Sequence, residues 1–373
     1  MKRPSWQSLL ALLLCLFGGV TLPLAVAGTA LPFSGGESAA ILLLLLGSVA
    51  LSLSNMPPVA GSIVLFIAVH IAAFLLVIGI AGNEGAARLS FFALLLAGWV
   101  LAWRLVTILS AIRPATRTGQ RLLSFFIPFL FGLWILILWE GFTRGAGIPF
   151  VLLPPPSSVA ARFVTSLPIL VADVEQTVFK STLAGYLIGC GIGFLVAIWA
   201  DRVPFLRRGM LPVGNVVSAL PIIGIAPIMV MWFGFGWESK AAVVVVMTFF
   251  PMLVNTVAGL AESGHMERDL MRTYAAGYWQ TLFKLRLPAA APFIFNALKI
   301  NSTLALIGAI VAEFFGTPIV GMGFRISTEV GRMNIDMVWA EIAVAAIVGS
   351  IFYGGVALVE RLTTFWHPSV RGG

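Results

Sequence analysis

Apolar and polar residues alternate in blocks along the chain, and about ten apolar blocks are separated by short polar or proline-containing stretches. A helix that crosses a bilayer needs roughly 20 predominantly apolar residues, and most of these blocks approach that length. The predicted spans are residues 9–27, 39–53, 59–81, 89–112, 124–142, 177–200, 209–233, 241–260, 289–312 and 339–359. The pattern predicts an all-α, polytopic membrane protein with about ten transmembrane helices.

The first apolar block has two interpretations. Lys2 and Arg3 precede a leucine-rich stretch that ends in Ala25-Val26-Ala27, which is the pattern of a cleaved signal peptide. Three more apolar blocks follow closely, and a membrane helix is stabilised by packing against such neighbours. We therefore favour an uncleaved first helix, with cleavage as the alternative.

The seventh block is interrupted by Pro212, Pro221, Gly224 and Pro227. Backbone breaks at membrane depth are tolerated only where the backbone is buried in protein or lines a wet cavity. In the sixth block, Gly185, Gly189 and Gly193 recur every four residues and predict a smooth face for close helix contact.

A polar segment, residues 269–292, lies between the eighth and ninth spans and reads DLMRTYAAGYWQTLFKLRLPAAAP. Helical spacing places Leu270, Tyr274, Tyr278 and Leu282 on one stripe, and Gly277 can divide the segment into two short helices. Such a stripe suits a groove on a soluble partner, although an ordinary solvated loop is the alternative.

Composition agrees with residence in lipid. The chain is 60% hydrophobic and 10% charged, with a mean hydropathy of +1.02, whereas soluble proteins carry about 25% charged residues. The net charge of +8 is not concentrated in a dense basic run, so a nucleic-acid partner is not expected. Cys15 and Cys190 both lie in apolar blocks and offer neither a disulfide framework nor a metal site.

The placement of Lys and Arg predicts the orientation. With the N-terminus inside, the inner loops hold the clustered basic residues, which are Arg113, Arg117, Arg121, Arg202, Arg207, Arg208, Arg268, Arg272, Lys284 and Arg286. The outer loops hold single basic residues. This orientation places both termini and the polar segment in the cytoplasm.

Catalytic motifs are missing from the sequence. The nearest approach to a phosphate-binding loop, from Gly234 to Lys240, lacks the glycine before the lysine. Ionisable residues inside the spans are few, whereas ion-driven carriers usually place several at membrane depth. We therefore expect neither an enzyme nor a cofactor site. A transporter of this composition would need an energy source on a partner.

A short basic linker containing Arg113, Pro114, Arg117 and Arg121 separates the fourth and fifth spans. We place the domain boundary here. Residues 1–121 form one domain with about four spans, and residues 122–373 form a second with about six.

Four motifs follow the linker in order. They are Leu153-Pro154-Pro155-Pro156-Ser157; Pro221 and Pro227 followed by Trp232-Phe233-Gly234-Phe235-Gly236; the polar segment ending in Leu285, Leu287 and Pro288; and Val311-Ala312-Glu313 followed by Gly321-Met322-Gly323. From about residue 124 the chain thereby resembles the permease subunit of binding-protein-dependent ABC importers. It is most similar to the sulfonate, taurine, nitrate and pyrimidine-precursor branch. The resemblance does not cover residues 1–121, which form an N-terminal extension.

The polar segment resembles the family's ATPase-coupling loop, whose pattern is Glu-Ala-Ala, three residues, Gly, nine residues and Ile-x-Leu-Pro. Counting back from Pro288 places Ala275 where the family has glycine. Either Ala275 makes the turn or Gly277 has taken it over. The coupling residues that the resemblance implies are Asp269, Leu270, Met271, Arg272, Tyr274, Ala275, Gly277, Tyr278, Trp279, Leu287 and Pro288.

The resemblance implies a six-helix type I core in the bacterial inner membrane that moves a small anionic or heterocyclic solute by alternating access. Its implied partners are separate ATP-binding cassette ATPase subunits, a periplasmic substrate-binding protein and a second copy of the chain. The expected translocation path comprises Asn215, Ser218, Pro221, Pro227, Asn255, Asn296, Lys299, Asn301 and Ser302. Lys299 either attracts an anion or snorkels to the interface. The alternatives are an ion-coupled secondary transporter and a membrane scaffold or receptor subunit.

Overall fold

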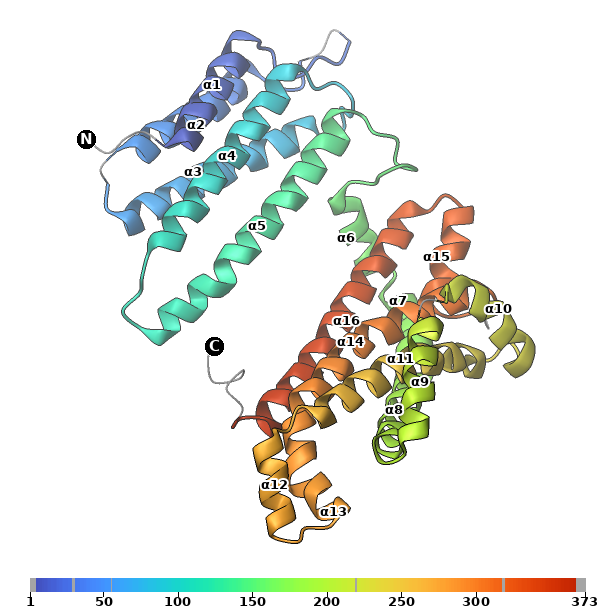
Figure 1. Ribbon diagram of the computed structural model, residues 1–373. Helices are drawn as coiled ribbons and strands as arrows, with labels where there is room; N and C mark the ends of the chain where they lie inside the picture. Colours follow the sequence, from blue (N-terminus) through green and yellow to red (C-terminus); the bar gives the residue numbers. More distant parts are fainter. Residues whose placement is uncertain (1–4, 29–30, 55, 219, 317–318, 367–373) are drawn as a thin grey trace. The chain divides into compact units, whose positions relative to one another are not determined.

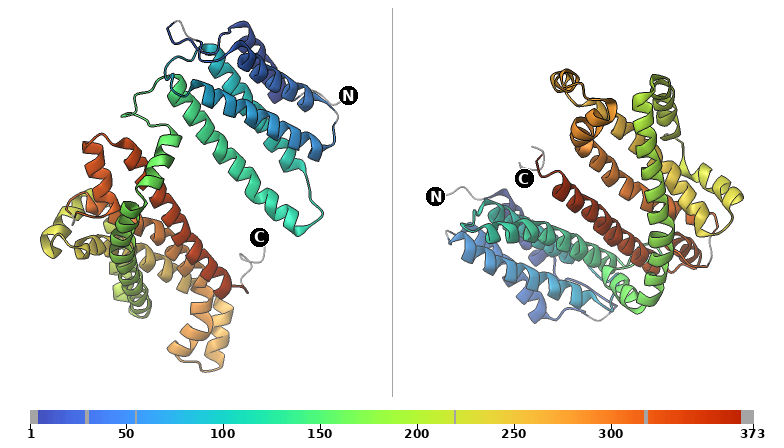
Figure 2. Two further views of the ribbon diagram at one scale, coloured as in Figure 1. Left: turned by 180° about the vertical axis from the view of Figure 1, so that it is seen from behind. Right: turned by 90° about the horizontal axis from the view of Figure 1, so that it is seen from below.

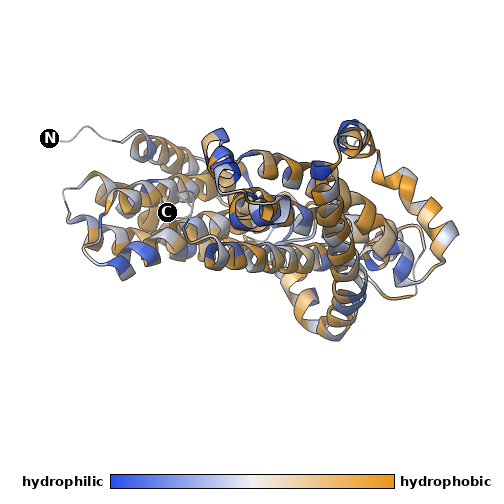
Figure 3. Ribbon diagram, turned by 60° about the horizontal axis from the view of Figure 1, so that its bottom comes forward, coloured by the Kyte–Doolittle hydropathy of each residue, from blue (hydrophilic) through white to orange (hydrophobic). Residues whose placement is uncertain are grey.

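The computed structural model describes residues 5–28, 31–54, 56–218, 220–316 and 319–366 (Figure 1). Within these ranges every named element is a helix, which confirms the all-α prediction. Eight helical stretches are long and apolar enough to cross a membrane, and Figure 3 shows hydrophobic colouring along much of their length. Shorter apolar helices, Trp6–Val20 and Ile222–Phe233, lie where the first and seventh spans were predicted.

The chain divides into two compact units, Met1–Ala161 and Arg162–Gly373. The helices of the first unit are α1 (Trp6–Val20), α2 (Gly35–Leu53), α3 (Pro58–Ile80), α4 (Leu89–Ala111) and α5 (Arg117–Gly145), and α6 (Pro156–Thr165) straddles the division. The predicted boundary after residue 121 would assign α5 to the second domain, yet α5 packs against α3 and α4 in the first unit. That boundary is placed at the basic linker between the fourth and fifth spans and stays a prediction.

A tryptophan–histidine pair joins α5 to α3 inside the first unit. The indole Nε1 of Trp134 donates to Nε2 of His70 at 3.2 Å, and Nδ1 of His70 lies 2.7 Å from the carbonyl oxygen of Phe66. Because Nε2 accepts, the proton of this imidazole is on Nδ1. The histidine therefore serves helix packing.

The second unit is built around α11 (Trp237–Ala261), which packs against α8 (Leu183–Arg202) and α14 (Leu287–Glu313). The remaining elements are α7 (Leu167–Val174), η1 (Glu175–Thr182), α9 (Pro204–Ser218), α10 (Ile222–Phe233), α12 (His265–Thr273), α13 (Tyr278–Thr281), η2 (Leu282–Arg286), α15 (Met322–Gly331) and α16 (Ile335–Thr363). The π-helical η1 joins α7 to α8. The sixth span accordingly begins at Leu167, ten residues before its predicted start at Thr177.

The glycine face of α8 makes the predicted close contact with α11. A Cβ added at Gly185 would lie 2.6 Å from the carbonyl oxygen of Ala241, and one at Gly193 would lie 2.6 Å from that of Phe249. Only hydrogen fits at such distances. The four-residue repeat therefore encodes backbone-to-backbone packing of the two central helices.

The predicted seventh span, 209–233, is interrupted as expected and consists of two helices, α9 and α10. Pro221 precedes α10, whereas Pro212 and Pro227 lie inside α9 and α10. Of the three prolines, only Pro221 lies at the break between the two helices. A proline suits the start of a helix better than its interior.

Candidate functional site

The polar segment between α11 and α14 folds back on itself as α12, a tight turn and α13. Figure 2 shows α12 and α13 projecting from one end of the second unit. From α13 the chain continues through η2 into α14 without a break, and Pro288 lies in the first turn of α14 as predicted.

The turn is made at Ala275, the position where the resembling family has glycine. Ala275 has φ +52°, whereas Gly277 has φ −68° and precedes α13 in extended conformation. The amide of Ala275 donates to the carbonyl of Arg272, and that of Ala276 to the carbonyl of Met271, which is the Schellman pattern for ending a helix. The alternative that Gly277 takes over this turn is therefore wrong.

One face of α12 is uncovered. Met266, Leu270 and Tyr274 follow one another at four-residue spacing, with 84%, 56% and 78% of their surface exposed, and α12 buries no residue. We call these three side chains the docking face. Beside them, Asp269 and Arg272 form an exposed ion pair at 3.2 Å.

Two residues of the predicted stripe, Leu270 and Tyr274, belong to the docking face, and the stripe does not continue past them. Leu282 is fully buried with Leu260 and Ala290, and is therefore wrongly placed on the stripe. The reversal at Ala275 gives α13 a different axis from α12, so a periodicity counted through the turn does not describe one surface. Trp279 and Phe283 remain exposed and stack with ring centroids 6.1 Å apart.

A cluster around Asp201, at the end of α8, holds the returning chain. Arg286 donates to both carboxylate oxygens of Asp201, at 2.6 and 2.7 Å, and also donates to the carbonyl oxygen of Leu260. The hydroxyl of Tyr278 donates to Asp201 at 3.2 Å. The guanidinium of Arg202 lies 5.4 Å from the centre of the Tyr278 ring. The cluster joins the ends of α8 and α11 to α13 and η2.

Sequence reasoning missed Asp201. The available signal was a single acid at the head of the basic loop 201–208, together with Arg286 in a segment assigned to the surface. Tyr278 was predicted to contact a partner, but its side chain is half-buried and its hydroxyl faces this cluster.

The residues predicted for a translocation path lie in different surroundings, and the path stays a prediction. Asn296 is exposed, while Asn255 donates to the carbonyl oxygen of Pro251 in its own helix, at 2.8 Å. Ser302 is buried and donates to the carbonyl of Lys299. Pro221 directly precedes α10, and Pro227 lies inside that helix. The side chains of Asn215 and Ser218 lie outside the described part of the chain.

Asn301 is buried where three helices meet. Its Nδ2 donates to the carbonyl oxygen of Thr248 on α11 at 2.8 Å and lies 3.2 Å from Sγ of Cys190 on α8. Such a position holds α14 against its neighbours.

Lys299 has a partner within the chain. Its ammonium lies 2.7 Å from a carboxylate oxygen of Glu360 on α16, and both side chains are largely buried. A lysine so paired has little charge left to attract an anion, because the carboxylate neutralises it at contact distance.

The Val-Ala-Glu and Gly-Met-Gly motifs meet at the start of α15. The carboxylate of Glu313 accepts from the amide of Gly323 at 2.7 Å and from the hydroxyl of Thr177 at 2.8 Å. A Cβ at Gly323 would lie 2.0 Å from the carbonyl oxygen of Ile310, so only glycine lets the backbones of α14 and α15 approach this closely. The motifs therefore cap a helix and bind it to η1.

Asp173 completes this second cluster, and sequence reasoning missed it. It accepts from the amide of Gly321 at 2.6 Å and pairs with Arg325 at 2.8 Å. Among the described residues no group of three or more His, Cys, Asp or Glu side chains is arranged to hold a metal ion.

The family profile described as "Binding-protein-dependent transport system inner membrane component" matches residues 189–371. The chain is 31% identical over 248 residues to a formylaminopyrimidine transport permease of Halalkalibacterium halodurans, covering 64% of this chain and 95% of the relative. It is 28% identical over 236 residues to a riboflavin transport system permease of Chloroflexus aurantiacus, covering 63% and 88%. A taurine transport system permease of Escherichia coli is 25% identical over 252 residues, covering 64% and 88%.

Proposed function

The chain belongs to the family of binding-protein-dependent transport system inner membrane components, and from this premise we propose that ATPase subunits on separate chains dock on α12 and drive transport. The protein itself is the membrane-spanning permease subunit of an importer of small solutes. One observation carries the docking proposal, namely that α12 is amphipathic and its apolar face is uncovered.

The docking face suits a groove on a soluble subunit. A short helix that presents apolar and aromatic side chains at four-residue spacing is the form that groove-binding proteins accept. In water, the exposed Met266, Leu270 and Tyr274 would be an unfavourable apolar patch. The flanking Asp269–Arg272 pair supplies a polar rim that helps to set orientation.

Movement would pass from α12 into the membrane helices through the Asp201 cluster. Arg286 ties the returning chain to the end of α8 and to the carbonyl of Leu260 at the end of α11. A displacement of α12 would therefore displace two of the helices that form the centre of this unit. No step of this coupling needs a catalytic residue on this chain.

We further propose that both termini and α12 face the cytoplasm, because the clustered basic residues then lie inside. A second copy of the chain would complete the path, and a periplasmic substrate-binding protein would deliver the solute from the opposite side. Transport by alternating access requires two such facing halves.

We propose a small heterocyclic solute rather than an anion. Lys299 was the residue predicted to attract an anion, and its charge is neutralised by Glu360. The two relatives first named above carry formylaminopyrimidine and riboflavin in their names, and both are heterocycles.

The docking proposal is tested by co-purification of the ATPase with the permease. Leu270→Ala combined with Tyr274→Ala removes two side chains of the docking face and should lower the yield of the complex about tenfold or more. The control is Leu187→Ala, an exposed leucine on another helix, α8, which should leave the yield unchanged. Equal ATPase recovery with the double variant and wild type would refute the proposal.

A further inference from the structure

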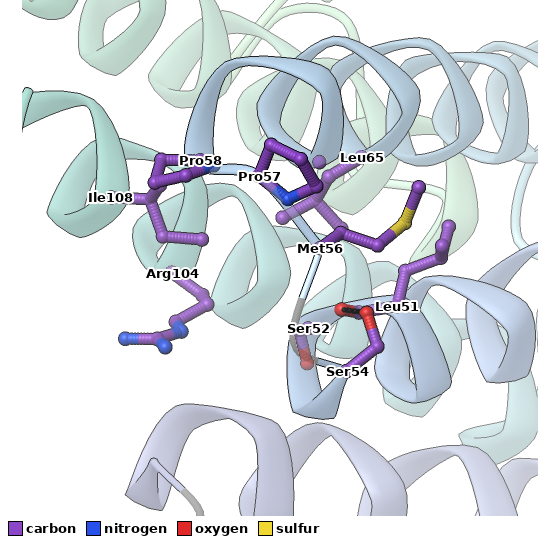
Figure 4. Close-up of a pocket in the computed structure, with 10 residues that line it drawn as sticks. Leu51, Ser52, Ser54, Met56, Pro57, Pro58, Leu65, Arg104 and Ile108 are labelled. Atoms are coloured by element: carbon purple, nitrogen blue, oxygen red, sulfur yellow. Dashed lines mark hydrogen bonds between the residues drawn. The ribbon is translucent and has the colours of Figure 1, made fainter. Parts of the chain in front are cut away.

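The first unit contains a pocket of about 440 Å³ that the importer function does not use (Figure 4). It lies between the end of α2, the turn into α3 and the last third of α4. Its lining residues are Leu51, Ser52, Ser54, Met56, Pro57, Pro58, Gly61, Leu65, Arg104 and Ile108.

Arg104 is the unexplained group in this pocket. Its Nε is buried and, among the described residues, has no hydrogen-bond partner. None of the described residues that line the pocket is a carboxylate. A buried donor of a charged group without an acceptor is unfavourable, so an acceptor from outside the chain would stabilise the site.

The pocket is lined by a charged residue, by polar residues and by aliphatic residues. Arg104 supplies a fixed positive charge with donors in a planar fork, which suits the oxygens of a phosphate. The hydroxyl groups of Ser52 and Ser54, on the α2 side of the pocket, donate to carbonyl oxygens of their own helix, those of Val49 at 2.8 Å and Leu51 at 2.7 Å, which leaves Arg104 as the donor for a phosphate. Leu65 and Ile108 provide aliphatic surface for a glycerol or acyl chain.

The depth of the pocket favours a lipid as the source of that phosphate. Arg104 precedes the last residue of α4, Ala111, by seven positions, or about 10 Å along the helix axis. The basic residues Arg113 and Arg117 follow directly and mark the cytoplasmic surface in the predicted orientation. Val59 and Ile63 on the adjoining α3 are exposed apolar residues, as expected for a surface that touches acyl chains.

We propose that this pocket binds the phosphate diester of a phospholipid headgroup, with Arg104 as its anion ligand. The pocket gives the N-terminal unit a lipid-binding site of its own. Because α2, α3 and α4 all contribute walls, the bound lipid would hold these three helices together.

The test is native mass spectrometry of the full-length chain, purified in detergent and supplied with phosphatidylglycerol. Wild type should retain one phospholipid per chain under mild activation. Arg104→Gln should bind it at least about tenfold more weakly, because a hydrogen bond to a charged group is worth about 1.5–3 kcal/mol. The control Arg117→Gln removes an exposed arginine that is not among the lining residues and should bind as wild type does.

A second variant guards against misfolding of the first. A Cβ at Gly61 would meet only Met56 Cβ, at 3.7 Å, so Gly61→Leu can fill the pocket and leave Arg104 in place. This variant should also lose the lipid. Equal lipid retention by Gly61→Leu and wild type, or by a folded Arg104→Gln and wild type, would overturn the proposal. Displacement of the lipid by millimolar inorganic phosphate would overturn the lipid assignment in favour of a free-anion site.

Discussion

Arg286 donates hydrogen bonds to both carboxylate oxygens of Asp201, across 85 residues of sequence, at 2.6 and 2.7 Å. The pair lies where the returning chain of the polar segment passes through η2 into α14, and both side chains are largely buried. Two-point contact between a guanidinium and a carboxylate fixes orientation as well as distance. This contact is the firmest link between the docking face and the helices α8 and α11.

Breaking this pair should weaken both stability and coupling. Arg286→Met leaves the Asp201 carboxylate buried and unpaired, which typically costs about 3–5 kcal/mol. We expect a lower melting temperature for the purified permease and less solute uptake per ATP hydrolysed by the complex. Asp201→Asn combined with Arg286→Met should recover part of the stability, because no buried charge is left. A melting temperature of Arg286→Met equal to that of wild type would contradict the structural role assigned to the pair.

The left-handed residue Ala275 predicts a stabilising substitution. An L-residue in this region carries a cost of about 1–2 kcal/mol that glycine avoids. Ala275→Gly should therefore raise the melting temperature, although the greater freedom of glycine in the unfolded chain offsets part of the gain. The neighbouring Ala276→Gly, which lacks the positive φ, should lower it. If both substitutions shift stability in the same direction, the turn is not at Ala275.

The packing of α8 against α11 should not tolerate a side chain on its glycine face. A Cβ at Gly189 would lie 2.1 Å from Oγ1 of Thr248 and 2.8 Å from the carbonyl oxygen of Val245. Gly189→Ala should destabilise the protein by about 1–3 kcal/mol, measured by thermal unfolding in detergent. Gly191→Ala is the matched control on the same helix, because a Cβ there has no neighbour within 4 Å. An equal loss in Gly191→Ala would contradict the assignment of the cost to the contact with α11, because alanine by itself favours a helix over glycine.

The pairing of Lys299 with Glu360 can be tested by a double substitution. Lys299→Met alone should lower stability by leaving a buried carboxylate, whereas Lys299→Met with Glu360→Met should restore it to near the wild-type value. Uptake of the solute by the double variant should be retained. Loss of uptake in the double variant, with its stability restored, would show that Lys299 contacts the solute after all.

The sequence anticipated the membrane helices well because the length and polarity of a span are local properties. It misplaced the start of the sixth span at Thr177, because residues 167–176 contain Asp173 and Glu175. Asp173 is accommodated inside the second unit by Arg325 and the amide of Gly321. The contacts with Arg325 and Gly321 explain why Asp173 can lie within the long apolar helix Leu167–Arg202.

The candidate site was predicted in its register but not in its contacts. Counting back from Pro288 left the turn open between Ala275 and Gly277, and the structure places it at Ala275. The helical stripe was extended too far, to Leu282, because periodicity cannot signal a reversal of direction. Tyr278 was treated as a surface residue because its partner, Asp201, is 77 positions away.

The sequence alone determined that the chain is built of helices long and apolar enough to cross a membrane, where its polar segment lies and which face of α12 is apolar. Each of these follows from composition and spacing within one stretch of residues. Only the tertiary structure decided that Arg286 meets Asp201, that Glu313 binds the amide of Gly323 and the hydroxyl of Thr177, and that Lys299 is neutralised by Glu360. These pairings depend on how separate helices pack, and buried charges are stable only where that packing brings a partner to them.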